Sequence, residues 1–295
     1  MTATAQEDVT TERSAPAGLW FRLNPTLTRV RGYLSQPRWW LEIALIWVIY
    51  QTYSFVRNLG GKDSAPAFAN GTAIEDLEKR LFIGIEQPVN HWVNANRWIA
   101  DLSALHYHTL HWWVTIGVAV WLYWTNRPGY RRASLVLALT TLIALAGFYL
   151  IPTAPPRMYD GYHDVMAQTA TWGWWETSGS PGPESMTNQF AAMPSLHCGW
   201  AIWAGLMIVL YARRPWVRVL GAVYPFTTFF VVVGTANHYI LDIVAVAAVI
   251  AVAMVIVYAP WRQAAGAVLR RPASSDAPAP NAPSAPSIPA GRSEA

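Results

Sequence analysis

The sequence has little of two things that soluble proteins use freely, cysteine and charge. It contains one cysteine, Cys198, in 295 residues, which excludes an internal disulfide framework and a metal site built on paired thiols. Charged residues make up 13% of the chain, and 21 Lys and Arg against 17 Asp and Glu leave a surplus of +4. So small a surplus argues against nucleic acid, and we expect no such partner.

Apolar and aromatic residues are abundant instead. Hydrophobic residues make up 53% of the chain, and it holds 17 Trp. This composition is typical of a multi-pass membrane protein. The first residues contain no apolar stretch, so we expect no cleavable signal peptide and insertion through the first spanning helix.

Six apolar segments are each long enough, with their flanks, to cross a bilayer: 39–56, 107–124, 135–151, 196–211, 217–235 and 239–258. The sequence therefore predicts an all-α fold, an integral membrane six-helix bundle. We place this catalytic domain at residues 38–260. It follows a disordered or interfacial segment, 1–37, and precedes a Pro/Ala-rich tail, 261–295, that we expect to be disordered and cytoplasmic.

A different helix is predicted between the first two segments. Thr72 and Glu75 have capping-box spacing, and Pro88 is expected to break or bend the run that follows. Apolar residues recur there at helical intervals: Ile74, Leu77, Leu81 and Ile85. Five charged residues lie between them, too many to bury: Glu75, Asp76, Glu78, Lys79 and Arg80. We therefore expect a juxtamembrane amphipathic helix on the membrane surface.

The distribution of arginine predicts the orientation. Arginines gather before the first segment and after the second, fourth and sixth, whereas loop 152–193 holds only Arg157 against four acidic residues. The positive-inside rule then places both termini in the cytoplasm and that loop outside the cell membrane. Loop 57–101 weakens the signal, with five basic and six acidic residues on the expected outer side.

Polar residues stand where spanning segments begin, and we expect chemistry there. His238 and Asp242 are four residues apart, so on a helix they share a face. The carboxylate can then accept a hydrogen bond from one imidazole nitrogen and free the other to attack. His197 is a second histidine that can protonate a leaving oxygen.

Two further features favour an anion at this place. Arg157 can neutralise a phosphoryl group. Pro194 fits a first helical position, which would leave the first-turn amides and the Ser195 hydroxyl facing a phosphate. Together these residues predict phosphoryl transfer through a phosphohistidine, at the outer membrane surface.

These motifs resemble those of a known family. Ala192–His197, His238–Asp242 and Pro152–Arg157, with Thr109–His111, are similar to signatures of the type 2 phosphatidic acid phosphatase superfamily, in its inositolphosphorylceramide-synthase-like (inositolphosphotransferase) branch. The resemblance implies a six-helix membrane enzyme that acts on a lipid phosphate or phosphodiester without a metal or other cofactor. It also implies His238 as nucleophile, Asp242 as its partner and His197 as general acid.

The sequence departs from the wider superfamily at three points. Its Lys-x6-Arg-Pro signature is absent, its Ser-Arg pair is replaced by Val231 and Val232, and its usual Gly is Leu196. The basic residue that replaces these groups is left open between Arg57, Lys62 and Arg97. We assign phosphate binding to four residues: Arg157, Ser195, Asn188 and His111.

Other interpretations of these residues stay open. His197, His238 and Asp242 would also suit a two-histidine, one-carboxylate metal site, although we expect no metal. His111 either orients the site or packs. The other histidines, His91, His106, His108 and His163, are expected to be structural hydrogen bonders. Three tryptophans of the outer loop are expected to anchor it at the interface or cover the site: Trp172, Trp174 and Trp175.

The function predicted from all this is a membrane lipid phosphotransferase, with a lipid phosphate or phospholipid as its partner and no assigned protein partner. One alternative is a simple lipid phosphate phosphatase acting on phosphatidate or polyprenyl phosphate. Another is a non-catalytic transporter of anionic lipids, which would move the lipid without cleaving it.

Overall fold

The computed structural model describes residues 38–44, 46–48, 51, 64–175 and 189–259. Every regular element within these ranges is a helix, apart from an isolated bridge between Thr153 and Ala191. The all-α prediction is therefore confirmed for the described part of the chain. The elements are α3 (Ser64–Arg80), α4 (Glu86–Ala95), α5 (Arg97–Thr125), α6 (Arg127–Leu150), the 3-10 helix η1 (Pro156–Met158), α7 (Val165–Thr169), α8 (Leu196–Tyr211), α9 (Pro215–Gly234) and α10 (Ile240–Tyr258).

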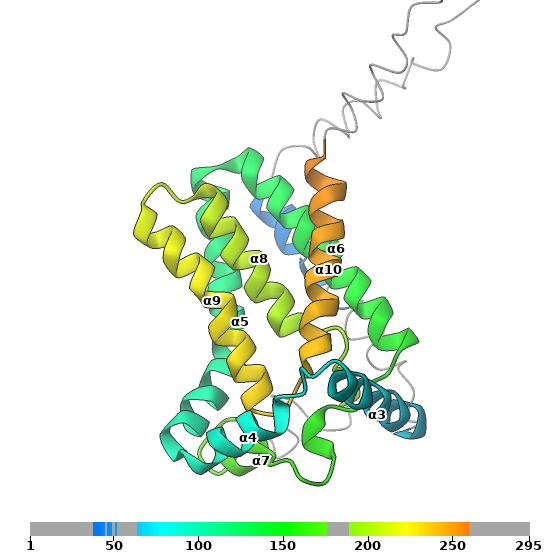
Figure 1. The fold of residues 1–295 in the computed structure, drawn as a ribbon. Coiled ribbons are helices and arrows are strands. Elements are labelled where there is room, and N and C mark those ends of the chain that lie inside the picture. The colour runs from blue at the N-terminus through cyan, green and yellow to red at the C-terminus, as the bar shows by residue number, and fades with distance from the viewer. Residues whose placement is uncertain (1–37, 45, 49–50, 52–63, 176–188, 260–295) are drawn as a thin grey trace, which may run out of the picture. The chain divides into compact units, whose positions relative to one another are not determined.

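Long helices pack around α8, and short ones gather at one end of them (Figure 1). α8 packs against α5, α6 and α9. Gly199 of α8 lies beneath Val246 of α10, where a Cβ would come within 2.7 Å of a Val246 methyl group. α3, α4 and α7 lie at the end where α9 terminates and α10 begins (Figure 1). The Asn90 side chain of α4 fastens this end by donating to the Gly234 carbonyl at 2.9 Å.

Small residues let the antiparallel helices α8 and α9 approach closely. A Cβ added to Gly205 would lie 2.5 Å from the Gly221 carbonyl oxygen. Close backbone approach at small residues is typical of helix pairs in lipid, where apolar burial does not drive association. A larger side chain at Gly205 would therefore push α9 away from the helix that carries His197.

Within the part of the chain that the structure describes, three helices are long and apolar enough to cross a membrane: α6, α9 and α10. The apolar helix α8 is shorter, at 16 residues. Each segment expected from residue 107 onward lies in a helix, although α5 begins at Arg97. The first segment, 39–56, is helical at 39–44, 46–48 and 51, and its other residues lie outside the described part, as do 1–37 and 261–295. The six-span count stays a prediction.

The helix expected near Thr72 differs in its start, its end and its buried face. It begins at Ser64, so Thr72 and Glu75 are interior residues and form no capping box. It ends at Arg80, shortly before Phe82 with its positive φ of 57°. Pro88 lies in the first turn of α4, where proline is tolerated, and so does not interrupt a helix.

The apolar residues expected on one face of this stretch are not buried together, and the amphipathic helix on the membrane surface stays a prediction. Leu77, Leu81 and Ile85 are about half exposed. The buried residues of α3 are instead Ala67, Gly71, Ile74 and Glu78. Glu78 has no exposed surface, which contradicts the expectation that the charged residues of this stretch stay on the surface.

Candidate active site

The first turn of α8 carries His197, one of the two motif histidines. Ser195 is the N-cap residue, and its Oγ accepts a hydrogen bond from the Cys198 amide at 3.4 Å. α8 therefore begins at Leu196, and the expectation that Pro194 is its first residue is wrong. The Ser195 amide donates to the Asp242 backbone carbonyl at 3.3 Å, which ties this terminus to the start of α10.

His238 lies in the turn between α9 and α10, with 4% of its surface exposed. Its Nδ1 is 2.9 Å from the Ala192 carbonyl oxygen and 3.3 Å from Asp242 Oδ2. Because both partners only accept hydrogen bonds, Nδ1 carries the proton. In the neutral ring Nε2 therefore keeps its lone pair, as a nucleophile requires.

Asp242 serves both the histidine and the turn. It is completely buried, in the first turn of α10. Its Oδ2 also accepts from the Tyr239 amide at 2.9 Å, and its Oδ1 has no hydrogen-bond partner within the described part of the chain. The expected contact between His238 and Asp242 is thus present, but the shorter bond of the ring goes to Ala192, a backbone carbonyl that the sequence did not point to.

The structure brings His197 to His238 and adds His111. The rings of His197 and His238 have centroids 6.0 Å apart. His197 packs between two residues of α5, stacked on Tyr107 at 4.0 Å and edge-on to His111 at 4.3 Å. Two of three core motif residues and one candidate phosphate ligand therefore form a chain of imidazoles, His111, His197 and His238.

Arg157 reaches the same turn but is engaged there. Its Nε donates to Asn237 Oδ1 at 2.9 Å, and its backbone amide donates to the Ala236 carbonyl at 2.8 Å. One terminal nitrogen pairs with Asp164 at 3.2 Å. The arginine thus holds the residues just before His238, and part of its charge is already compensated.

The remaining candidates for phosphate neutralisation are placed differently. Asn188, Arg57 and Lys62 lie outside the described residues. Arg97, at the start of α5, is largely exposed and pairs with Asp101 at 3.1 Å. A surface ion pair of this kind gives no sign of a role at the histidines.

The other histidines have mostly structural surroundings. His91 Nε2 bonds the Gly161 carbonyl at 2.8 Å, and its ring packs against His163. His106 Nε2 bonds Thr228 Oγ1 at 3.1 Å. His108 is buried and stacks on Trp175 at 4.2 Å, and its Nε2 has no hydrogen-bond partner among the residues that the structure describes, so its expected hydrogen bond stays a prediction.

Sequence reasoning missed two buried carboxylates beside the site. Glu86 Oε1 accepts from the Ile240 amide at 2.9 Å, and Glu78 Oε1 accepts from the Leu241 amide at 2.6 Å. Burial, followed by the neighbouring Glu86 carboxyl, raises the pKa of the Glu78 carboxyl to about 9. The spacing of Ala67, Gly71 and Ile74, with Glu78 next on the same stripe, is the signal that would have found it.

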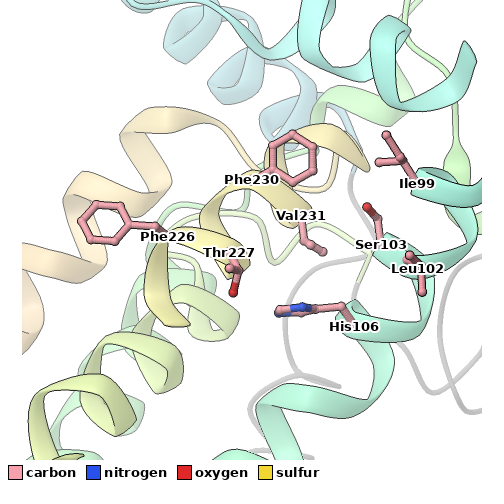
Figure 2. Close-up of a pocket in the computed structure, with 8 residues that line it drawn as sticks. All are labelled: Ile99, Leu102, Ser103, His106, Phe226, Thr227, Phe230 and Val231. Carbon is pink, nitrogen blue, oxygen red and sulfur yellow. The ribbon is translucent and has the colours of Figure 1, made fainter. Parts of the chain in front are cut away.

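An apolar groove of about 460 Å³ lies beside this site, between α5 and α9 (Figure 2). His106 points from α5 toward Thr227 and Val231 of α9. The groove is lined by Ile99, Leu102, Ser103, His106, Phe226, Thr227, Phe230 and Val231. Its lining includes neither motif histidine, so the groove is a feature of the outer α5–α9 seam.

The metal interpretation was also open. Within residues 38–44, 46–48, 51, 64–175 and 189–259, no three His, Cys, Asp or Glu side chains are grouped so as to hold a metal ion. His197, His238 and Asp242 thus converge without forming a ligand set. Their arrangement places an amide-bearing helix terminus beside two imidazoles, and such a terminus can attract an anion.

Comparison with known proteins identifies a relative of this chain. The chain is 28% identical over 168 residues to a phosphoinositol dihydroceramide synthase from Bacteroides thetaiotaomicron. That match covers 52% of this chain and 53% of the relative, so the chain spans about half the length of the curated relative it matches. No solved structure matches.

A family model covers more than half of the chain and includes every motif described above. It is that of the PAP2 superfamily, and it matches residues 72–256, from the middle of α3 almost to the end of α10. The histidine motifs, the helical architecture and this match agree, and the chain belongs to the PAP2 superfamily.

Proposed function

We propose that this chain is a membrane phosphotransferase that moves a phosphate-containing head group from a phospholipid to a lipid hydroxyl, through a phosphohistidine on His238. The observation that carries the proposal is the state of that ring. With Nδ1 bonded to Ala192 and Asp242, Nε2 is the unprotonated nitrogen, and His197 lies beside it. The turn before α10 thus supplies a nucleophile, and α8 supplies a separate acid.

In the first step His238 Nε2 attacks the phosphorus atom of the donor. A phosphorus–nitrogen bond forms as the bond from phosphorus to the lipid oxygen breaks. His197, in its protonated form, gives its proton to that oxygen, so a neutral lipid alcohol leaves. Asp242, beside the Nδ1 proton, stabilises the positive charge that the phosphorylated ring acquires.

In the second step an acceptor hydroxyl replaces the histidine. His197, now neutral, takes the proton of the incoming hydroxyl as its oxygen attacks phosphorus. The phosphorus–nitrogen bond breaks and restores His238. With water as the acceptor the same cycle is hydrolysis, so the acceptor alone separates a transferase from a phosphatase. No step requires a metal or another cofactor.

The anionic group is held chiefly by the start of α8. The first amides of a helix lack intrahelical partners and attract anions. Ser195 caps this terminus with a neutral hydroxyl, whose proton is free to donate to a phosphate oxygen. His111 contributes from α5, and Arg157 adds the charge that Asp164 leaves uncompensated. Asn188 is the fourth expected ligand.

The relative's name supports a transferase over a phosphatase. It is a phosphoinositol dihydroceramide synthase, so we propose a phosphoinositol lipid as donor and a ceramide-like alcohol as acceptor. Apolar helices support a site that meets lipids within the membrane. We further propose six spans with α3 on the membrane surface, both termini in the cytoplasm, and the histidines at the outer face of the cell membrane.

The test is a transfer assay with purified full-length protein in lipid nanodiscs. Phosphatidylinositol labelled on phosphorus is supplied with dihydroceramide, with buffer alone, or with a chelator added. We expect label on dihydroceramide, no loss with the chelator, and an acid-labile label on the protein that His238→Ala abolishes. Label released as water-soluble inositol phosphate would identify a hydrolase. Movement of intact donor across the bilayer without cleavage would identify a transporter.

A further inference from the structure

The residue before α10 and the first two residues of α10 give their amides to three carboxylates. Tyr239 donates to Asp242, Ile240 donates to Glu86, and Leu241 donates to Glu78. The two glutamates come from α4 and α3, about 160 residues earlier in the chain, at separations of 154 and 163. Distant elements therefore finish the cap of the helix whose first turn carries Asp242.

The two glutamates are buried as completely as core residues. Glu78 has no exposed surface and Glu86 has 2%. Each fills a need of α10, because the first amides of a helix have no intrahelical acceptor and favour negative charge. An uncompensated pair of buried carboxylates would nevertheless be costly, since like charges repel strongly away from water.

A shared proton resolves that cost. Glu78 Oε2 is buried without a hydrogen-bond partner among the described residues, and the neighbouring Glu86 carboxyl can bond with Glu78 only if one of the two is protonated. Burial first, and then Glu86, raises the pKa of Glu78 to about 9, with Asp242 adding to the effect from α10. A further carboxylate, Glu75, lies nearby. It accepts a hydrogen bond from the Tyr162 hydroxyl at 3.4 Å, and burial and Glu75 raise the pKa of that hydroxyl.

The cap of residues 239–241 affects the nucleophile, His238, through the backbone. His238 directly precedes the capped amides of Tyr239, Ile240 and Leu241, and Asp242 directly follows them. A change in this cap therefore moves the histidine and the carboxylate relative to one another. The contact between their side chains is long, at 3.3 Å, so a small displacement breaks it.

We propose that Glu78 and Glu86 are positioning residues of the reaction: by sharing one proton they fix residues 239–241 and so keep His238 and Asp242 in register. The proposal rests on the proposed function. Neither glutamate touches substrate. They act through the turn, and the protonated pair is the active form.

Two substitutions at Glu78 test this, with transfer measured as above. Glu78→Ala removes the acceptor of the Leu241 amide, and we expect kcat to fall about tenfold or more with KM within about threefold. Glu78→Gln keeps an acceptor for Leu241 and a donor for Glu86, so it should restore most of the lost kcat. Asp76→Asn, on the exposed side of the same helix, is the matched control and should leave kcat unchanged.

The decisive readout is the ratio of kcat for Glu78→Gln to kcat for wild type across pH. Ionisations shared by both proteins cancel in this ratio. It should be flat near neutrality and rise about tenfold by one pH unit above the Glu78 pKa of about 9, because only wild type loses the shared proton. A purely structural role would lower stability but leave the ratio flat.

The outcomes separate the two proposals. A flat ratio, or full kcat in Glu78→Ala, overturns the positioning role while transfer by wild type and its loss in His238→Ala still support the function. If Glu78→Ala fails to fold, the pH ratio of Glu78→Gln decides alone. If wild type forms no product under any condition, the proposed function fails and not the inference alone.

Discussion

Two helices begin side by side at this site, and their termini are capped in opposite ways. α8 starts behind a serine hydroxyl, which is neutral, with His197 in its first turn. The amides at the start of α10 are held by carboxylates from α3, α4 and α10 itself. The Ser195 amide bonds the Asp242 carbonyl, so the two termini are in direct contact.

The difference separates two tasks that a phosphotransferase needs. The positive end of a helix attracts an anion unless a carboxylate already compensates it. At α10 that end is used internally, to hold the turn of the nucleophile. At α8 a neutral cap leaves the end available to the substrate. In the proposed mechanism, one terminus fixes the attacking group and the other receives the group under attack.

Removing the nucleophile should have the largest effect. His238→Ala deletes the only ring whose Nδ1 is held by Ala192 and Asp242, and we expect kcat to fall about 10⁴-fold. His197→Ala should approach this loss, because the leaving oxygen then lacks its acid. Both are measured by transfer in nanodiscs, with circular dichroism to verify folding. Wild-type turnover in either variant would contradict the mechanism.

Giving α8 the charged cap of α10 breaks the contrast directly. Ser195→Asp keeps a good N-cap acceptor but places a carboxylate where the phosphate should bind. A repulsion of ~4 kcal/mol at close range corresponds to a loss of about 10³-fold in kcat/KM.

Two variants show whether charge is the cause. Asparagine is neutral and nearly isosteric with aspartate, so Ser195→Asn should lose far less activity than Ser195→Asp. Asn126→Asp introduces the same carboxylate at the N-cap of α6, whose side chain accepts from Gly129 at 3.0 Å. It should leave transfer unchanged. Equal losses in the Asn and Asp variants of Ser195 would mean that space, and not charge, matters there.

Neutralising the partner of the nucleophile should have a smaller effect. Asp242→Asn still offers an oxygen to the Tyr239 amide, and the Ala192 carbonyl still holds the His238 tautomer. When a carboxylate alone fixes the tautomer, its loss costs about 10⁴-fold, so we expect about 10²-fold here. The measurement is the rate of label transfer to His238 in single turnover. A loss as large as that of His238→Ala would show that Ala192 does not hold the ring.

The sequence predicted which residues lie at the two helix termini better than it predicted the contacts that these residues make. The four-residue spacing of His238 and Asp242 predicts a contact on a shared helical face. The contact is present, but α10 begins at Ile240, so His238 reaches Asp242 from the preceding turn and not from the same helix. The Ala192 carbonyl is a backbone group in a loop, which no side-chain pattern marks. The pairing of His111 with His197 depends on the register between α5 and α8, which is set by packing.

The glutamates were missed for another physical reason. Charge in a short helix normally indicates a solvated face, and Leu77, Leu81 and Ile85 offered an apolar stripe. In a membrane protein that rule reverses, because lipid accepts an exposed leucine and a buried carboxylate can be satisfied by amides and a shared proton. Glu78 follows the small residues Ala67 and Gly71, which allow α3 to pack closely.

The smallest predicted effect concerns the arginine next to the α10 turn. Arg157→Lys keeps a cation near Asp164 but loses the bond from Nε to Asn237. We expect kcat to fall about tenfold with KM for the donor little changed, because one hydrogen bond to the turn is lost and the phosphate is held mainly at α8. Arg97→Ala, at an exposed pair on α5, is the control and should change kcat less than about twofold. A rise in KM without a fall in kcat would instead place the Arg157 charge on the phosphate and weaken the division of tasks between the two termini.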